Sequence, residues 1–216
     1  MPELRHDPIQ KRWVIIATER GRRPSDFLKV EEAASGGFCP FDIGNEDKTP
    51  PEVMALRQPG TEPNTPGWEV RVVSNKFPAL RIEGELDRAA DGIYDKMNGI
   101  GAHEVIIETP RHDISLADQP LEQIQKVLLM AQMRLDDLMK DSRFRYVLIF
   151  KNHGTTAGAS LAHPHTQIIA TPVTPRTVAM ELETCRAHYH VKERCLICDI
   201  MTQEIKQEIR VISIID

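Results

Sequence analysis

The sequence lacks an excess of basic charge and lacks any long apolar run. Lysine and arginine together number 27, against 32 aspartates and glutamates, so the formal net charge is −5. This balance argues against a dedicated nucleic-acid-binding protein, because such proteins carry a basic patch or stripe. No apolar run reaches the roughly 18 residues that a membrane-spanning helix needs. We therefore expect neither nucleic acid nor a membrane among the partners of this chain.

The N-terminus also lacks the apolar segment of a secretory signal, and cysteines are few. The first residues, MPELRHDPIQKRW, are mostly polar, so we expect a cytoplasmic protein. Among the 4 cysteines, Cys195 and Cys198 form a Cys-x-x-Cys unit, whereas Asp42 follows Cys39 at the same spacing. In the cytoplasm this usage favours metal or redox chemistry over a disulfide framework.

Apolar periodicity predicts an α+β fold with a mostly antiparallel sheet and one long amphipathic helix. Strands are expected over residues 11–18, 68–74, 103–108, 145–150 and 163–170. Helices are expected over residues 121–140 and 177–190. The apolar face of the longer helix is assigned to positions 121, 124, 127, 128, 131, 135 and 138. Residues 31–66 show no clear period and are expected to be irregular, and residues 83–99 are expected to form a polar excursion.

The most informative segment runs from residue 152 to residue 167. Pro164 favours extended backbone around it, and in an extended strand His163, His165 and Gln167 face the same side, roughly 6–7 Å apart. Glycines in the preceding loop let backbone N–H groups approach an anion closely. The alternative is a chance sequence at a strand edge, but the combination favours a phosphate site around a histidine.

A histidine in a phosphate site points to nucleotidyl transfer, because a neutral imidazole is a good nucleophile toward phosphorus. It can displace one phosphate of a diphosphate and hold the nucleotidyl group as a phosphoramidate. A phosphate leaving group needs little protonation, so a strong general acid is unnecessary. Gln167 suits this chemistry, because a carboxamide donates hydrogen bonds to phosphate oxygens without titrating.

Further motifs extend the pattern along the chain. They are RxxRP at 20–24, CPF at 39–41, GNE at 44–46, RVVxNKFP at 71–78, GxHEV at 101–105 and TPxH at 109–112. Together with His-Pro-His-x-Gln at 163–167, they resemble the galactose-1-phosphate uridylyltransferase branch of the histidine-triad superfamily. The resemblance covers residues 5 to about 200 and implies a histidine-triad-like fold.

The resemblance also implies roles for individual residues. His165 would be the nucleophile that carries the nucleotidyl group, and His163 would be a metal ligand. Asn152, Ser160 and Gln167 would contact the phosphates.

Four residues from the N-terminal part complete the implied substrate site. Asn75 and Phe77 would lie at the nucleoside, with ordinary core packing as the alternative for Phe77. Arg20 and Arg23 would be directed at phosphate, across a dimer interface, with a solvated turn as their alternative.

The resemblance further implies a structural zinc site made of a Cys-x-x-Cys pair and two histidines. The matching positions are Cys39, Asp42, His112 and His163. Aspartate at position 42 departs from the pattern, since thiolates and imidazoles are more typical of structural zinc sites. Either Asp42 completes a Cys/Asp/His/His site or it points away and the site is degraded. We predict bound Zn²⁺ that keeps residues 31–66 ordered.

The Cys195–Cys198 pair is similar to one that opens the second half of some relatives and binds another metal, zinc or iron. Two more ligands would be needed for tetrahedral zinc, and two reduced cysteines on a helix are the alternative. We predict an N-terminal nucleotidyltransferase domain over residues 1–175 and the start of a truncated second histidine-triad-like domain over residues 176–216. An artificially shortened chain, a natural short form and assembling half-length subunits would each explain this ending.

The activity implied by the resemblance belongs to galactose metabolism. UMP would move from UDP-glucose to galactose 1-phosphate through a covalent uridylyl-histidine, so the partners would be a UDP-sugar, a hexose 1-phosphate and a second copy in a homodimer. An ADP-glucose donor with phosphate as the acceptor is one alternative. A histidine-triad hydrolase is another, opposed by Gln167 and the long N-terminal extension. A zinc-stabilised binding module without catalysis is the third.

Overall fold

The computed structural model describes residues 1–18, 38–159 and 161–215. Two compact units divide the chain, Met1–Val173 and Thr174–Asp216. Strands dominate the first unit and helices make up the second. None of the helices in the described ranges combines the length and the apolarity needed to traverse a lipid bilayer.

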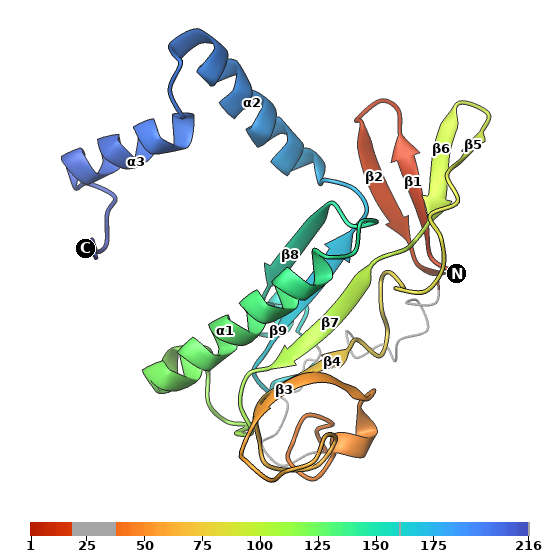
Figure 1. The fold of residues 1–216 in the computed structure, drawn as a ribbon, viewed down its shortest axis with the longest axis vertical. Helices are drawn as coiled ribbons and strands as arrows, with labels where there is room; N and C mark the ends of the chain where they lie inside the picture. Colours follow the sequence, from red (N-terminus) through yellow and green to blue (C-terminus); the bar gives the residue numbers. More distant parts are fainter. Residues whose placement is uncertain (19–37, 160, 216) are drawn as a thin grey trace. The chain divides into compact units, whose positions relative to one another are not determined.

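A five-stranded antiparallel sheet forms the centre of the first unit (Figure 1). Its strand order is β3 (Glu52–Arg57), β4 (Trp68–Ser74), β7 (Ala102–Ile107), β9 (His165–Thr171) and β8 (Tyr146–Phe150). Strand β7 pairs with β4 on one side and with β9 on the other. These central strands are rich in β-branched residues, which pack well on a pleated surface. The α+β architecture and the antiparallel sheet expected from the sequence are confirmed.

Helix α1 (Leu121–Leu138) lies across one face of this sheet (Figure 1). Val127, Met130 and Ala131 of the helix pack against Val72 and Ile106 of the strands in one buried cluster. Burying a side chain of this size contributes about 1.5–3 kcal/mol to stability. The remaining members of this cluster are Val70, Ile100, Ala102, Leu138, Phe144, Ile168 and Ala170.

The opposite face of the sheet carries a second apolar cluster and is called the site face below. Trp68, Val73, Val105 and Ile107 are buried there, and Phe41 packs on them from the chain that precedes β3. Because side chains alternate along a strand, Val105 and Ile107 point away from α1 while Ile106 points toward it. The site face therefore receives every second residue of β7 and of its neighbour β9.

A smaller antiparallel sheet completes the first unit. Its order is β2 (Arg12–Ile16), β1 (Glu3–Asp7), β6 (Tyr94–Asn98) and β5 (Ala89–Asp91). The β5–β6 hairpin lies in residues 83–99, and β3 lies in residues 31–66. The irregular conformation expected for residues 31–66 is wrong at β3, and the polar excursion expected over residues 83–99 contains the β5–β6 hairpin. Their residues are mostly polar or half-exposed, so pairing with a neighbouring strand decides their conformation.

The second unit contains two helices, α2 (Arg176–Lys192) and α3 (Leu196–Gln207). Neither helix has a buried residue. Within the unit, His188 of α2 and Asp199 of α3 approach to 3.2 Å. Short 3-10 helices occur in the loops of the first unit at Glu46–Lys48, Leu116–Asp118 and Thr155–Ala157.

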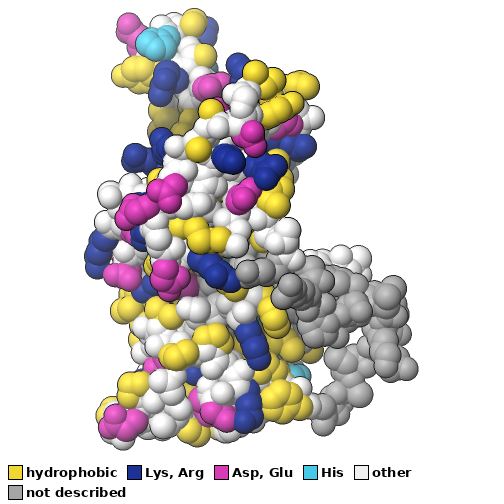
Figure 2. Space-filling view, turned by 90° about the vertical axis from the view of Figure 1, so that its right-hand side faces the viewer, with side chains coloured by type: hydrophobic (Ala, Val, Ile, Leu, Met, Phe, Trp, Pro, Cys, Tyr) yellow, Lys and Arg dark blue, Asp and Glu magenta, His cyan; other side chains and the backbone are white. Residues whose placement is uncertain are grey.

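Charged side chains of both signs are interspersed on the described surface that Figure 2 presents. Lysines and arginines lie beside aspartates and glutamates, with apolar side chains between them. This mixture agrees with the small net charge of −5 for the whole sequence.

Candidate active site and metal centre

Strand β9 presents His165 and Gln167 on the site face. The two residues pair in register with Ile107 and Val105 of β7, which belong to the apolar cluster of that face. His163 comes just before the strand rather than within it. The imidazoles of His163 and His165 both pack edge-on against Phe41, with ring centroids 6.1 Å and 5.5 Å away. The two histidines therefore contact the same aromatic ring, although His163 lies outside the strand that the sequence predicted from residue 163.

A hydrogen bond of the His165 ring decides which of its two nitrogens carries the proton. Its Nδ1 lies 2.8 Å from the backbone carbonyl oxygen of His163. A carbonyl oxygen only accepts, so Nδ1 carries the proton and Nε2 keeps its lone pair. Burial lowers the pKa of His165 and outweighs the opposing effect of the hydrogen bond to the carbonyl oxygen of His163, while the nearby ammonium of Lys151 acts in the same direction as burial. The imidazole is therefore held neutral, which is the state that attacks phosphorus.

A buried ion pair supports the backbone of His165 from the other side of β9. The ammonium of Lys151 lies 2.7 Å from Oε1 of Glu108 and 3.2 Å from the carbonyl oxygen of His165. The hydroxyl of Thr166 donates to the same carboxylate oxygen at 2.7 Å. Glu108 is completely buried, and its Oε1 is paired and hydrogen-bonded as a buried charge requires, whereas its Oε2 has no hydrogen-bond partner among the described residues. This arrangement links β9 to the segments that carry Glu108 and Lys151.

Gln167 takes part in a hydrogen-bonded group with His103 and Asn75. Its Oε1 lies 2.9 Å from Nε2 of His103 and 3.4 Å from Nδ2 of Asn75. Nδ1 of His103 accepts a hydrogen bond from the backbone N–H of Ala79 at 3.1 Å. The sequence singled out His103 only as part of a motif, because its neighbours Asn75, Ala79 and Gln167 come from distant parts of the chain.

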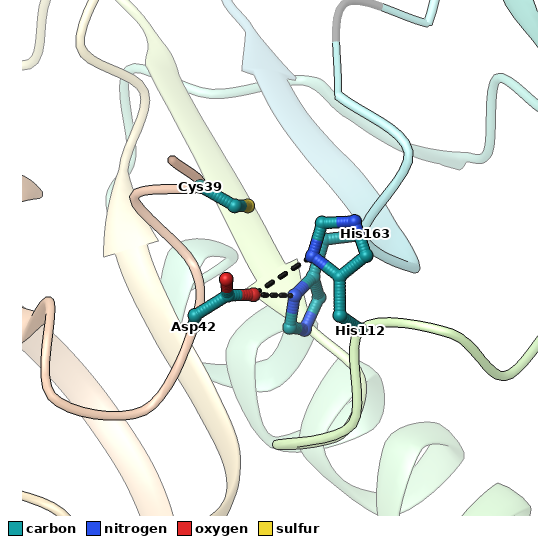
Figure 3. A group of neighbouring side chains, drawn as sticks. All are labelled: Cys39, Asp42, His112 and His163. Carbon is teal, nitrogen blue, oxygen red and sulfur yellow. Dashed lines mark hydrogen bonds and ion pairs between the residues drawn. The ribbon is translucent and has the colours of Figure 1, made fainter. Parts of the chain in front are cut away.

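Cys39, Asp42, His112 and His163 converge on one point in front of the site face (Figure 3). One ligand atom from each side chain lies within 4.8 Å of the others. Oδ1 of Asp42 is 2.8 Å from Nδ1 of His112 and 3.0 Å from Nδ1 of His163. Asp42 thus points toward both histidines, which favours the first of the two alternatives left open by the sequence.

The surroundings of His163 fit a metal ligand. The side chain is fully buried, and its Nε2 lies 2.8 Å from the carbonyl oxygen of Thr109. That oxygen accepts the Nε2 proton, so Nδ1 of the neutral ring keeps a lone pair directed at Asp42. A backbone carbonyl on the far nitrogen is the usual support of a metal-bound histidine. A cation between Nδ1 and the carboxylate would satisfy both groups.

The pKa shifts of Asp42 and Cys39 also bear on a metal site. Burial opposes ionisation of Asp42, but the neighbouring imidazoles of His112 and His163 outweigh it and lower the pKa of the carboxyl. Burial raises the pKa of the Cys39 thiol. Metal binding requires a thiolate and therefore displaces this proton. The four residues have the donor types and the convergence of a four-coordinate zinc site.

Polar contacts hold the segment with Cys39 and Asp42 against the sheet. The side-chain amide of Asn45 donates to the carbonyl oxygen of Cys39 at 2.7 Å. Glu46 accepts the indole N–H of Trp68 at 2.8 Å and the backbone N–H of Gly44 at 3.0 Å. These bonds shape the ligand loop with protein groups alone.

Comparison with known proteins bears on this site. Residues 1–175 match the family model described as galactose-1-phosphate uridyl transferase, N-terminal domain. The chain belongs to the galactose-1-phosphate uridylyltransferase family. This is a family of nucleotidyltransferases.

Two curated relatives illustrate the range of this uridylyltransferase family. An ADP-glucose phosphorylase of Arabidopsis thaliana is 35% identical over 92% of this chain and 56% of its own length. A galactose-1-phosphate uridylyltransferase of Thermotoga maritima is 30% identical over 94% of this chain and 57% of its own. The chain spans a little more than half the length of these relatives.

Solved structures of the uridylyltransferase family share the fold. A uridylyltransferase superposes with a TM-score of 0.70 at 30% identity, over 94% of this chain and 56% of that one. The Arabidopsis ADP-glucose phosphorylase with bound ADP-glucose superposes with a TM-score of 0.65, over 92% of this chain and 58% of that one. Both superpositions cover more than nine tenths of this chain.

Of the remaining residues implied by the uridylyltransferase resemblance, some lie near Gln167 and others fall outside the described residues. Asn75 adjoins Gln167, and the backbone N–H of Phe77 donates to Oδ1 of Asn75 at 2.9 Å. Asn152 follows β8, is half-buried and forms no hydrogen bond with the described residues. Arg20, Arg23 and Ser160 lie outside the described residues, so their predicted phosphate contacts remain predictions.

The second predicted metal site of this uridylyltransferase-family chain is incomplete within the described residues. Cys195 precedes α3 and Cys198 lies in its first turn. Hydrogen bonding from the backbone N–H of Cys198 lowers the pKa of Cys195. The described ranges contain one group of three or more potential metal ligands, and it is the Cys39 group. The predicted role of Cys195 and Cys198 as ligands remains a prediction.

Proposed function

We propose that this chain transfers UMP from UDP-glucose to galactose 1-phosphate, with Nε2 of His165 as the nucleophile. The observation that carries the proposal is the hydrogen bond from Nδ1 of His165 to the carbonyl oxygen of His163, at 2.8 Å. It leaves a neutral ring with its nucleophilic nitrogen directed away from the backbone. The family assignment supports the reaction class.

In the first half-reaction, Nε2 of His165 attacks the α-phosphorus of UDP-glucose. The N–P bond forms as the bond from phosphorus to the bridging oxygen breaks, and glucose 1-phosphate leaves with that electron pair. The uridylylated ring is cationic because Nδ1 keeps its proton. The carbonyl oxygen of His163 then stabilises the charge, since hydrogen bonds from charged donors are the stronger ones.

In the second half-reaction, a phosphate oxygen of galactose 1-phosphate attacks the same phosphorus. The N–P bond breaks, UDP-galactose forms and His165 returns to the neutral ring. Gln167 and Asn152, with Ser160, would donate hydrogen bonds to the phosphates. Arg20 and Arg23 would compensate the phosphate charge. A carboxamide at position 167 keeps these contacts free of titration.

Two further residues and the metal complete the proposed site. Asn75 and Phe77 would contact the nucleoside. Zn²⁺ held by Cys39, Asp42 and the two histidines would act structurally, by joining three separate segments. The homodimer, the cytoplasmic location, a second zinc or iron ion at Cys195 and Cys198, and the domain division at residue 175 belong to this proposal as predictions.

An adenylyl donor is the second candidate. The observation that favours it is the 35% identity to an ADP-glucose phosphorylase, against 30% to the Thermotoga uridylyltransferase. The histidine chemistry is the same for both donors. ADP-glucose would supply AMP to His165, and inorganic phosphate would accept it.

Intact-protein mass spectrometry tests the proposal. The chain is incubated briefly with UDP-glucose and, in parallel, with ADP-glucose. We expect a mass gain of one uridylyl group that is absent from His165→Ala and present in the matched control His190→Ala, whose histidine lies exposed on α2. A gain with ADP-glucose alone would transfer the assignment to the adenylyl donor. An adduct that persists in His165→Ala, or no adduct from either donor in folded, zinc-loaded protein, would overturn the proposal.

A further inference from the structure

We infer that His103 is a positioning residue that orients the side-chain amide of Gln167, so that its NH₂ group faces the phosphates. This inference deepens the proposed function and rests on it for its catalytic consequence. The evidence is a chain of hydrogen bonds that begins at a backbone N–H, where the donor is certain. From that donor, the direction of each later bond follows.

The first step fixes the tautomer of His103. The backbone N–H of Ala79 donates to Nδ1 at 3.1 Å. A nitrogen that accepts a hydrogen bond carries no proton, so the proton of the neutral ring is on Nε2. Nε2 lies 2.9 Å from Oε1 of Gln167 and donates to it. The ring thus relays the direction of a backbone N–H to a side chain on the neighbouring strand.

A second bond of known direction supports the same orientation. The backbone N–H of Phe77 donates to Oδ1 of Asn75 at 2.9 Å. The amide of Asn75 therefore turns Nδ2 toward Gln167, whose Oε1 lies 3.4 Å away. Nδ2 of Asn75 also approaches Nε2 of His103 to 3.2 Å, and because Nε2 carries the proton in this tautomer, this is a close contact between two donors that both face Oε1 of Gln167. Both donors meet the carbonyl end of Gln167.

The consequence concerns the other end of the Gln167 amide. Its oxygen has two donors, so the NH₂ group occupies the opposite side. Within the described part of the chain this nitrogen donates no hydrogen bond, and it is not one of the enclosed polar atoms that lack a partner. With respect to the described residues, this nitrogen is therefore available to a ligand. A flipped amide would direct its oxygen at the phosphate, and two acceptors would face each other.

The burial of His103 suits a fixed relay. The residue lies in β7, 5% exposed, one strand away from β9. A rigid strand holds a supporting side chain more accurately than a loop does. The benefit is preorganisation, because the donor already has its direction before negative charge develops on the transferred phosphate.

Three variants of the full chain separate positioning from packing. His103→Asn retains an acceptor for Ala79 but is too short to reach Gln167. His103→Gln retains a donor at the reach of Nε2. Gln167→Ala removes the amide on which His103 acts.

The first readout is the rate of adduct formation from the donor that labels the wild type. We expect His103→Asn to slow it by about 10- to 100-fold, the effect of losing a hydrogen bond around a charged group. His103→Gln should recover most of that loss. The double variant His103→Asn/Gln167→Ala should be no slower than Gln167→Ala, because His103 acts through Gln167. Independent, multiplying losses would overturn the inference and indicate a packing role.

The second readout needs no activity. Long-range ¹H–¹⁵N spectra of the unliganded chain distinguish the two imidazole tautomers, and the His103 signals are assigned by their absence from His103→Gln. We expect the Nε2–H tautomer and a displaced side-chain amide signal of Gln167 in His103→Asn. An Nδ1–H tautomer or an unmoved amide signal would overturn the inference. Wild type without any adduct would refute the proposed function, while the spectra would still decide the orientation.

Discussion

At the scale of single residues, two histidines separated only by Pro164 present opposite ring nitrogens. His163 has its Nε2 beside the carbonyl oxygen of Thr109, so Nδ1 is left for Asp42. His165 has its Nδ1 beside the carbonyl oxygen of His163, so Nε2 is left for substrate. The acceptor near each ring, rather than the residue type, decides which nitrogen can bind or react. One ring becomes a candidate ligand and the other a candidate nucleophile.

The sequence predicted this histidine pair but not the assignment of nitrogens. The spacing of His163, His165 and Gln167 follows from an extended backbone, which is a local property. The partner of His163 is the carbonyl oxygen of Thr109, and the partner of Gln167 is His103. These contacts depend on strand pairing, which no local pattern specifies.

Asp42 gives a direct prediction about the metal centre. We expect Asp42→Ala to weaken zinc binding by at least about 100-fold, since even the loss of an outer supporting group costs 10- to 100-fold. Asp42→Cys should bind at least as tightly as the wild type, because it supplies a second thiolate. Competition with a chromophoric chelator measures both affinities.

The control for this prediction is Asp113→Ala, which removes an exposed carboxylate next to His112. It should leave the zinc affinity unchanged. Equal affinities of the wild type and Asp42→Ala would show that Asp42 is not a ligand.

At the scale of elements, helix α1 illustrates how periodicity locates a helix better than it locates the buried face. The predicted range of residues 121–140 agrees closely with Leu121–Leu138. However, Leu121 and Leu128 were assigned to the apolar face and are 70% and 64% exposed. Arg134 is buried instead. Arg134 faces the sheet because it pairs there with Glu104 of β7.

The Arg134–Glu104 pair explains why Arg134 lies on the buried face of α1. Nε and Nη2 of Arg134 donate to the two carboxylate oxygens of Glu104, each at 2.8 Å. This bidentate geometry satisfies both charges within the interface. Hydrogen bonds to Glu104 raise the pKa of Arg134. A hydropathy pattern assigns arginine to solvent, so it cannot reveal a buried partner on another element.

Breaking this pair should destabilise the fold. We expect Arg134→Met to cost about 3–5 kcal/mol, because Glu104 would remain buried without its counter-charge. The double variant Arg134→Met/Glu104→Met should recover a large part of that loss. Urea unfolding followed by circular dichroism measures the free energies.

Lys126→Met provides the matched control on the same helix. Lys126 pairs with Glu69 at 3.0 Å, and both side chains are more than a third exposed. Such pairs contribute about 0–1 kcal/mol. An equal cost for the two methionine variants would show that Arg134 is not specifically important.

At the scale of the whole molecule, the apolar cores lie in the first unit. The three buried clusters formed by the described residues draw their members from positions 4 to 173. Helices α2 and α3 contribute no buried residue. The sequence predicted a division at residue 175 from family resemblance, and the compact units divide after Val173.

This distribution predicts that residues 1–173 fold by themselves. We expect this fragment to unfold in one cooperative thermal transition close to that of the full chain, because it contains each apolar cluster. Residues 174–216 alone should show no cooperative transition, since so small a unit rarely stabilises itself without added cross-links or metals. Circular dichroism melting curves test both fragments.

Loss of cooperative unfolding in the 1–173 fragment would contradict this division. A control fragment that ends at residue 163 removes β9, the strand between β7 and β8. It should fail to fold, which would confirm that the assay detects an incomplete core.

The four candidate metal ligands lie far apart along the chain, and this spacing has a kinetic consequence. Because these two residues meet only where the sheet of β4, β7 and β9 is formed, we expect Cys39 and His163 to come together after these strands have paired. Closing such long loops costs entropy, so the ion finds its full ligand set late in folding. Interactions absent from the transition state slow unfolding without speeding folding. A bound ion would therefore prolong the lifetime of the folded chain rather than hasten its formation.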